Sequence, residues 1–527
     1  MHDGKADRLG KSLKLLVKTS IIVFIGVMIS RILGYLYRVI VARYYGPEVY
    51  GLFSLALMVS GWFIAVSALG LAEGLLRFIS LYRGKKELEK IKWLFKFSLI
   101  ILTITGVLAG ILLFVFSEYI SITIFHNASL IAYLKIFSIA IPFTVLAYPF
   151  LVALRAHEEI SSYSFIFNIA QNAVKVAFLG LFIVLGFGNN AVPWSYLAGM
   201  FGMMTISYLV CKYKIPHIFE LGTLPQHKKG ILLKELMSYS VPILFFGIVS
   251  TIFYWIDSFS IGYYKSAIEV GFYNAAVPIA LLLGIAPELF MQLFFPLITK
   301  EYSRKNIKLI EELSKQVAKW ILLVNIPVFA LMLAFPGAVI NILFGQEYLV
   351  AENALRILAI SSLLSSVLIV SNQLISMIGR AKLVLTNIII ASAINLMLNM
   401  LFVPMQKIWF IENSLGINGA ALATLISILV FNLLFVIESY YYLRIIPVRR
   451  KMINLLVSAV IPTALLFYLR TIISSNNILV LALLGAGFVV VYAALVLATK
   501  SMDENDWKIM KSAWNKVISY FSQGKSS

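Results

Sequence analysis

Residues 42–57 read ARYYGPEVYGLFSLAL, and residues 262–277 read GYYKSAIEVGFYNAAV. Each stretch passes from a hydrophobic run through paired tyrosines and a short polar link to a glycine, an aromatic residue and several small residues. The two glycines, Gly51 and Gly271, are 220 positions apart. The same corner is therefore written twice in one chain.

Two further pairs of residues repeat at nearly the same distance. Asn168 and Asn387 are 219 positions apart, and Lys135 and Arg356 are 221 positions apart. Three separate pairs agree within one residue, so the sequence predicts an internal duplication with a period of about 220 residues. Apolar helices use few residue types, and chance similarity between them is the alternative explanation.

The composition places the chain in a membrane. Of its 527 residues, 61% are hydrophobic and 13% are charged, and the mean hydropathy is +0.92. A water-soluble globule cannot bury so much apolar surface. The charged N-terminal residues are followed by no small-residue cleavage site, so we expect the first helix to remain in the mature protein. The single Cys211 excludes an intrachain disulfide.

The apolar runs predict about fourteen membrane-spanning helices, because a span needs about 20 mostly apolar residues. The predicted spans cover residues 15–42, 49–82, 93–116, 128–154, 161–186, 192–211, 235–263, 267–298, 318–344, 352–379, 383–404, 415–443, 452–473 and 477–499. In the register of the repeat, the first six correspond to the next six. An even number of helices in each half makes the two repeats parallel.

The predicted fold is therefore an all-α integral membrane protein with two six-helix bundles and two additional C-terminal helices. The bundles are related by a pseudo-two-fold axis along the membrane normal and leave a cleft that opens to each side in turn. The predicted segments are a tail (1–14), the first bundle (15–211), a linker (212–234), the second bundle (235–443), helices 13 and 14 (452–499) and an amphipathic helix (503–522).

The basic residues fix the expected orientation. The formal net charge is +20. Most Lys and Arg lie in the two tails and in those loops that the predicted spans place on the same side of the membrane as the N-terminus. The opposite loops carry Arg43, Lys265, Lys407 and Arg470. The positive-inside rule then predicts cytoplasmic N- and C-termini in the cell membrane, and it explains the charge without nucleic acid. The amphipathic helix lies on the inner membrane surface or packs on a cytoplasmic loop.

Three stretches resemble a known family. They are ISRILGYLYRVIVARYYGPEVYGLFSLALMVSGWFIAVSALGLAEGLLRFIS (29–80), VGFYNAAVPIA (270–280) and INLMLNMLFVPMQKIWFIENSLGINGAALATLIS (394–427). They are similar to polysaccharide biosynthesis proteins of the Wzx type, in the multidrug/oligosaccharidyl-lipid/polysaccharide (MOP) exporter superfamily. The resemblance implies a MATE-like fold and a flippase for a polyprenyl-diphosphate-linked saccharide. It also implies a monomer in contact with membrane lipids and near glycan-assembly enzymes, with basic residues of the first bundle receiving the diphosphate.

The first half carries cations within its apolar spans, at Arg31, Arg38, Arg77, Lys135 and Lys175. Each would cost about 2.5 to 3.5 kcal/mol at the bilayer centre, so these side chains are expected to avoid lipid. Arg31, Tyr35 and Arg38 follow one helical face at i, i+4 and i+7. Because a guanidinium can bind two phosphate oxygens at once, this face is a candidate diphosphate site. Alternatively, Arg38 reaches the outer interface and Arg31 pairs within the protein.

A polar stripe marks the fifth predicted helix. Asn168, Gln171, Asn172 and Lys175 fall at i, i+3, i+4 and i+7, so they face either a cavity or another helix. Asn168, Asn172 and Lys175 are therefore candidate substrate-binding residues. Lys135, near the outer end of the fourth helix, is a weaker candidate because it can extend to the interface.

The candidate ion-coupling residues are acids. Asp257 and Glu288 lie inside spans of the second half, where a deep carboxylate suits proton or sodium coupling. Glu73 is the third candidate, although it can simply neutralise Arg77 one turn later. Asp257 can likewise pair with a neighbouring helix.

Three residues of the second half are predicted to be structural. Asn395 and Asn399 lie one turn apart and are expected to form hydrogen bonds between helices. Gly419 belongs to a small-residue stretch that permits close helix contact.

Other functional classes fit the sequence less well. A membrane glycan polymerase or ligase would need acids or a metal site, commonly in a long soluble loop, but the five His are scattered without metal-ligand spacing. No phosphate-binding glycine-rich loop is present, so neither a catalytic site nor a cofactor is predicted apart from a coupling H⁺ or Na⁺. A MATE-type drug antiporter is the nearer alternative, but the cavity of such a protein should be acidic and aromatic.

Overall fold

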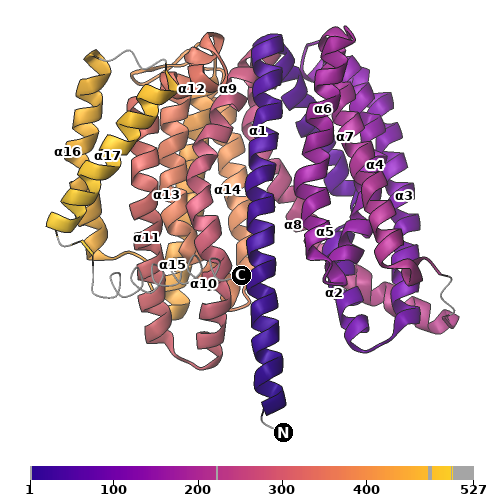
Figure 1. Cartoon of the computed structure of the whole chain (residues 1–527). Helices are drawn as coiled ribbons and strands as arrows, with labels where there is room; N and C mark the ends of the chain where they lie inside the picture. The colour runs from indigo at the N-terminus through magenta and orange to yellow at the C-terminus, as the bar shows by residue number, and fades with distance from the viewer. Residues whose placement is uncertain (1–2, 221–223, 473–476, 500, 503–527) are drawn as a thin grey trace, which may run out of the picture. The chain divides into compact units, whose positions relative to one another are not determined.

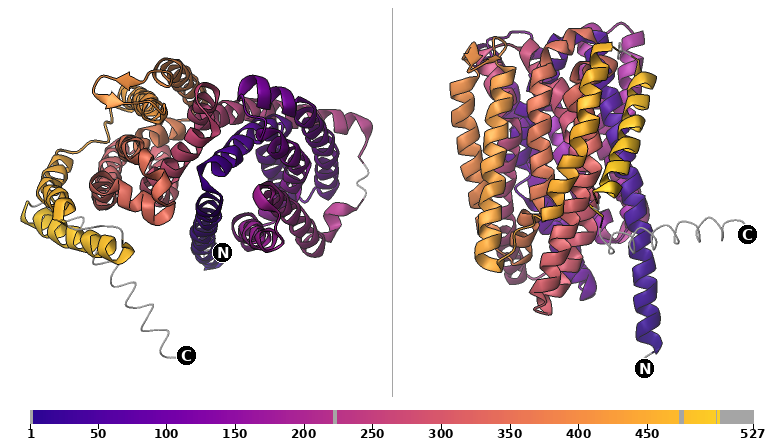
Figure 2. Two further views of the ribbon diagram at one scale, coloured as in Figure 1. Left: turned by 90° about the horizontal axis from the view of Figure 1, so that it is seen from above. Right: turned by 90° about the vertical axis from the view of Figure 1, so that its left-hand side faces the viewer.

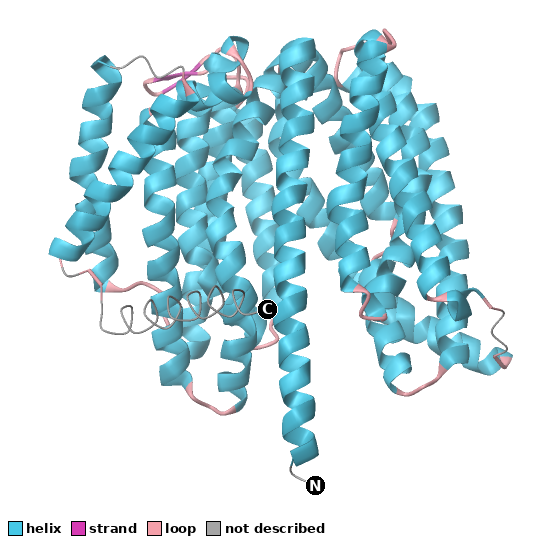
Figure 3. Cartoon of the chain, in the orientation of Figure 1, coloured by secondary structure: helices cyan, strands magenta, loops and turns pink. Residues whose placement is uncertain are grey.

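The computed structural model describes residues 3–220, 224–472, 477–499 and 501–502, and these are almost entirely helical (Figure 3). Within this described part, 13 helices are long and apolar enough to cross a membrane. The all-α membrane fold predicted from the sequence is confirmed. The amphipathic helix predicted at 503–522 lies outside the described residues.

The helix count differs from the prediction because the first two predicted spans form one kinked helix, α1 (Asp3–Ser67). The kink lies at Gly46, whose φ is 80° and which precedes Pro47. Glycine adopts this left-handed φ without strain, and proline lacks the N–H that would continue the helical ladder. The chain therefore bends at the corner without a loop. Helix α1 also begins inside the predicted tail.

The predicted second span is interrupted near its inner end. Leu69 and Gly70 have φ values of 51° and 64°, and the helix resumes as α2 (Leu71–Gly84). A Cβ on Gly70 would lie 2.3 Å from the Ser240 carbonyl oxygen, so only glycine fits at this break. The break explains why this segment is divided between two helices.

By its internal contacts the chain forms two compact units. Unit 1 comprises residues 1–274 and 392–420, and unit 2 comprises residues 275–391 and 421–527. This division does not fall at the predicted linker, 212–234, because α8 (Gln226–Tyr264) packs against α1 and α2 within unit 1. The predicted bundle boundaries stay a prediction.

Unit 1 is a helical bundle that includes a short hairpin. Besides α1, α2 and α8, its elements are α3 (Leu88–Tyr119), η1 (Ile120–Ile124), α4 (Leu130–Ala156), α5 (Ile160–Ser164), η2 (Phe165–Ala170), α6 (Gln171–Val184), η3 (Gly188–Asn190), α7 (Ala191–Lys214), η4 (Pro216–Phe219), β1 (Lys407–Ile408) and β2 (Ile411–Glu412). The strands pair antiparallel with Lys407 opposite Glu412. Helices α3, α4 and α7 lie side by side in that order (Figures 1 and 2). A Cβ on Gly110 of α3 would lie 2.7 Å from the Ser138 carbonyl oxygen of α4, so a small residue sets this close approach.

The two copies of the corner pack against each other. A Cβ on Gly51 would lie 1.6 Å from the carbonyl oxygen of Ala267 in α9 (Ala267–Ala280), and a Cβ on Gly271 would lie 2.1 Å from that of Pro47. Each copy thus presents its glycine to the main chain of the other, as in a contact between symmetry-related surfaces. The corner is written twice because each copy forms half of one contact.

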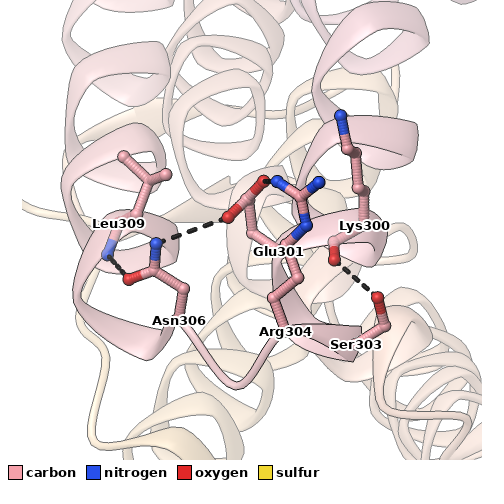
Figure 4. A network of polar contacts seen from close by, with 6 residues as sticks. All are labelled: Lys300, Glu301, Ser303, Arg304, Asn306 and Leu309. Atoms are coloured by element: carbon pink, nitrogen blue, oxygen red, sulfur yellow. Dashed lines mark hydrogen bonds and ion pairs between the residues drawn. The ribbon is translucent and has the colours of Figure 1, made fainter.

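Unit 2 contains the remaining helices. Its elements are η5 (Leu281–Gly284), α10 (Ile285–Ser303), α11 (Ile307–Ala334), α12 (Pro336–Leu343), η6 (Gln346–Ala351), α13 (Glu352–Met377), α16 (Arg450–Ile472) and α17 (Ile478–Ala498), while α9, α14 (Ala381–Phe402) and α15 (Ile417–Leu443) contribute to both units. The turn between α10 and α11 is held by Glu301, which accepts hydrogen bonds from Arg304 (3.1 Å) and Asn306 (3.3 Å) (Figure 4). Asn306 also caps α11 by accepting from the Leu309 N–H.

Candidate functional site

Arg31, Tyr35 and Arg38 lie on successive turns of one face of α1, as their spacing predicts. Both guanidinium groups interact electrostatically with the Tyr35 hydroxyl. Tyr254 of α8 interacts with Tyr35 and Arg38 from the neighbouring helix. The sequence therefore placed these three residues correctly relative to one another.

Lys175 of α6 joins this basic face. Its Nζ lies 5.9 Å from the centre of the Tyr37 ring, and it interacts electrostatically with Arg38. The Lys175 stem passes so close to Gly199 of α7 that a Cβ there would lie 2.2 Å from Cγ of the lysine. Tyr37 is fixed in turn by hydrogen bonds to the Val192 carbonyl oxygen and the Ser195 hydroxyl, both 3.0 Å long.

Arg38 and Lys175 have no acidic partner in the part of the chain that the structure describes. Neither Arg38 nor Lys175 forms an ion pair with any residue that the structure describes; the side-chain hydrogen bond of Arg38 goes to the Tyr50 hydroxyl. Two neighbouring positive charges in apolar helices repel each other and lose hydration, and both costs fall when an anion binds between them. The arrangement thus favours an anionic ligand.

The other polar residues of the stripe point to protein groups. Asn172 donates to the Ser30 hydroxyl of α1 (3.1 Å), and Asn168 donates to the Ser164 hydroxyl (3.1 Å). Both asparagines are more than nine-tenths buried. Asn168 lies within the π-helical turn η2, which rotates the side chains that follow it around the helix axis. Their amides hold α6 and η2 to neighbouring groups, and a substrate contact for them stays a prediction.

Lys135 lies apart from this face. Its ammonium group lies 5.5 Å from the ring of Phe114 in α3, and no contact within the described residues joins it to Arg38 or Lys175.

The suggested neutralisation of Arg77 by Glu73 is wrong. Glu73 lies 3.5 Å from Arg155, while the Arg77 guanidinium lies 4.3 Å from the centre of the Tyr239 ring. Arg155 at the end of α4 can reach Glu73, and the aromatic ring attracts the other guanidinium. Glu73 is also more than half exposed in its side chain.

Asp257 of α8 is at the centre of a second buried cluster. Tyr273 of α9 donates to its Oδ2 (2.5 Å), and Asn399 of α14 donates to its Oδ1 (2.9 Å). Asn399 also donates to the side chain of Asn395, 3.1 Å away. Asp257 is 9% exposed, and Tyr273, Asn395 and Asn399 are more deeply buried. A carboxylate held by two donors at this depth is a candidate site for exchange of a proton or a sodium ion.

The two clusters occupy equivalent positions of the repeat. Adding the period of 220 to Tyr37 and Lys175 gives Asp257 and Asn395. Phe53, whose ring lies 5.4 Å from that of Tyr37, corresponds in the same way to Tyr273, which contacts Asp257. One half thus holds the Lys175 ammonium where the other holds the Asn395 amide, and the Tyr37 phenol where the other holds the Asp257 carboxylate. Sequence reasoning missed Tyr37 and Tyr273, although subtracting the period from Asp257 would have indicated the first.

Tyr50 connects the two clusters and was also missed. Its hydroxyl accepts from Arg38 and donates to the Asn274 carbonyl oxygen (3.0 Å), and the Asn274 amide donates to Ser258 (2.9 Å), next to Asp257. Tyr50, Asn274 and Ser258 are all buried. A chain of hydrogen bonds therefore runs from the basic face to Ser258, the residue that follows Asp257 in α8.

Glu288 and Lys319 are charged residues that lie inside helices of unit 2. Glu288 of α10 lies in the wall of a cavity, described below. Lys319 of α11 is 1% exposed and was overlooked because it stands at the end of a predicted span. The predicted concentration of cations in the first half therefore has an exception in the second.

Gly419 lies close to the main chain of a neighbouring segment. Its N–H donates to Asn413 Oδ1 (2.7 Å), and a Cβ would lie 2.7 Å from the Phe402 carbonyl oxygen. Asn413 also donates to that carbonyl oxygen (2.7 Å), so there is no room for a side chain at position 419. Among the described residues, no group of His, Cys, Asp and Glu is arranged to hold a metal ion.

Comparisons with known proteins agree with this architecture. The lipid II flippase MurJ of Bacillus subtilis is 22% identical over 497 residues, which cover 85% of this chain and 87% of MurJ. A putative O-antigen transporter of Shigella flexneri is 24% identical over 402 residues, with 75% of this chain and 90% of the transporter covered. The solved structure of a lipid II flippase MurJ in an inward closed conformation matches with a TM-score of 0.71 at 18% identity, covering 90% of this chain and 98% of that one. At this identity the match shows a shared fold.

Family models give the assignment. The MatE model matches residues 242–401. The model described as polysaccharide biosynthesis protein matches residues 16–301, more than half of the chain. This multi-pass membrane protein therefore belongs to the polysaccharide biosynthesis protein family.

Proposed function

We propose that the protein is a flippase that moves a polyprenyl-diphosphate-linked saccharide across the cell membrane by alternating access. The observation that carries the proposal is the pair of cations, Arg38 and Lys175, that lie together in a half-buried region without an acidic partner among the described residues. A diphosphate supplies the missing negative charge, and Arg31, two turns before Arg38 on the same face of α1, adds a second guanidinium. Relatives that are named as a lipid II flippase and an O-antigen transporter support this substrate class.

The remaining parts of the proposal concern the oligomeric state, the orientation in the membrane and the coupling ion. The protein acts as a monomer with cytoplasmic termini and catalyses no covalent reaction. Asp257 exchanges H⁺ or Na⁺, and the path through Tyr50 transmits the occupancy of one cluster to the other. Asp257 suits this role because its hydrogen-bond donors, Tyr273 and Asn399, hold the carboxylate in place in either charge state.

A drug antiporter of the MATE type is the second candidate, favoured by the MatE match over residues 242–401. An organic cation would be repelled by Arg38 and Lys175, so the basic face opposes this candidate.

The deciding experiment is export of saccharide by single variants. Arg31→Ala and Lys175→Ala should each abolish export and leave the lipid-linked saccharide on the cytoplasmic side, while the protein still inserts normally. Arg31→Lys should restore export only in part, because the bidentate fork is lost. The matched control is Lys96→Ala, which removes a positive charge from an exposed position of α3. Normal export by both alanine variants would refute the basic site.

A further inference from the structure

Unit 2 contains a cavity of about 610 Å³ between α10 and α13, with a contribution from η5 and α15. Most of its wall is apolar, and its volume lies within the range of about 300 to 1,000 Å³ that ligand sites occupy. None of the functions assigned above uses this cavity.

Polar side chains enter the cavity from two helices. On α10, Glu288 and Gln292 lie one turn apart, and both line the wall. On α13, Ser362, Ser365 and Gln373 line the opposite wall at i, i+3 and i+11, which is one helical face.

Several of these groups are available to a ligand. Ser365 accepts a long hydrogen bond from Asn432 (3.5 Å). Gln292, Gln373 and Ser362, in contrast, form no hydrogen bond with any residue in the described ranges. Amide groups in membrane-spanning helices are costly unless water or a ligand satisfies them. The cavity therefore offers two amides, each able to donate and to accept.

We propose that this cavity binds the saccharide part of the transported lipid, and that it selects a non-acidic sugar. Amides exchange hydrogen bonds with sugar hydroxyls, and the Phe295 ring covers an apolar sugar face. The described wall contains no Lys or Arg, so it offers no positive charge to the diphosphate or to a uronic acid. The assignment rests on the proposed flippase function.

The test measures binding to the full-length protein in nanodiscs. The probes are citronellyl diphosphate and the same lipid diphosphate carrying N-acetylglucosamine, glucose, galactose or glucuronic acid. In the natural protein at least one neutral sugar should lower Kd about tenfold relative to the bare diphosphate, and glucuronic acid should not. In the double variant Gln292→Leu/Gln373→Leu this gain should disappear, while Kd for citronellyl diphosphate stays unchanged. Gln406→Leu, an exposed glutamine outside the cavity, is the matched control and should keep the gain.

The outcomes separate the two levels of the proposal. Diphosphate binding without any sugar gain, or a gain that survives in the double variant, overturns the saccharide site. Absence of binding to every lipid diphosphate overturns the flippase proposal itself. If the double variant does not fold, the volume-conserving Gln373→Met replaces it and should reduce the gain about threefold. Tight binding of tetraphenylphosphonium that Glu288→Gln abolishes, with no effect of that change on sugar binding, would assign the cavity to organic cations instead.

Discussion

The close contact between Gly51 and Gly271 leads to a prediction about the stability of unit 1, which contains both clusters. In Gly51→Ala the new Cβ would lie 1.6 Å from the Ala267 carbonyl oxygen, where ordinary contact begins at 3.4 Å. The two segments must therefore separate by about 2 Å. Neither atom can rotate away, because one belongs to the main chain and the other is fixed to it.

The cost follows from this geometry. Overpacking a filled interior costs about 1 to 3 kcal/mol, and a clash with the main chain falls at the upper end of that range. Separation would also break the hydrogen bond from Tyr50, next to Gly51, to Asn274, worth about 1 kcal/mol. We expect Gly51→Ala to lower the free energy of unfolding by about 3 to 4 kcal/mol, and the melting temperature by about 3 to 6 °C.

The assay is the fraction of purified protein that remains monodisperse in detergent after heating. The control is Gly247→Ala in α8, where a Cβ meets nothing within 4 Å and where alanine improves helix propensity. Gly271→Ala should resemble Gly51→Ala, and the double variant should lose less than the sum, because one separation relieves both clashes. A melting temperature for Gly51→Ala equal to that of Gly247→Ala would refute the close contact between the two corners.

Three further predictions concern the clusters themselves. Lys175→Met keeps the stem over Gly199 and removes a cation that costs about 2.5 to 3.5 kcal/mol at depth, so export should be lost while the melting temperature stays equal or rises; a less stable but exporting variant would contradict this. Asn399→Leu removes one hydrogen-bond donor to Asp257 and should lower the free energy of unfolding by about 1 to 3 kcal/mol, measured by thermal denaturation. An unchanged free energy of unfolding would contradict this. Tyr50→Phe removes the hydroxyl that links the clusters and should abolish the effect of pH or Na⁺ on the Kd for citronellyl diphosphate; an unchanged dependence would exclude this path.

Much of the fold could be predicted from the sequence because membrane helices and repeats are local signals. The apolar runs indicated the spans, the repeated corner indicated the duplication, and the spacing of Arg31, Tyr35 and Arg38 fixed their common face of α1. The kink at Gly46 was not predicted, since a glycine and a proline between two apolar runs are equally compatible with a loop.

Tertiary structure alone decided which charges meet. The sequence left open whether Glu73 neutralises Arg77, its neighbour on the same helix; in the structure it contacts Arg155, and Asn172 bonds to Ser30 of α1. These partners are separated by many tens of residues, so no local pattern specifies them.

The sequence by itself determined that this is a duplicated helical membrane protein with cations in its first half, because periodicity and hydropathy act within single helices. Only the tertiary structure decided that Lys175 joins Arg38 beside Tyr37, and that the equivalent positions of the repeat surround Asp257. The physical reason is that the burial and the partners of a side chain depend on which helices pack together, and that packing joins segments far apart in the sequence.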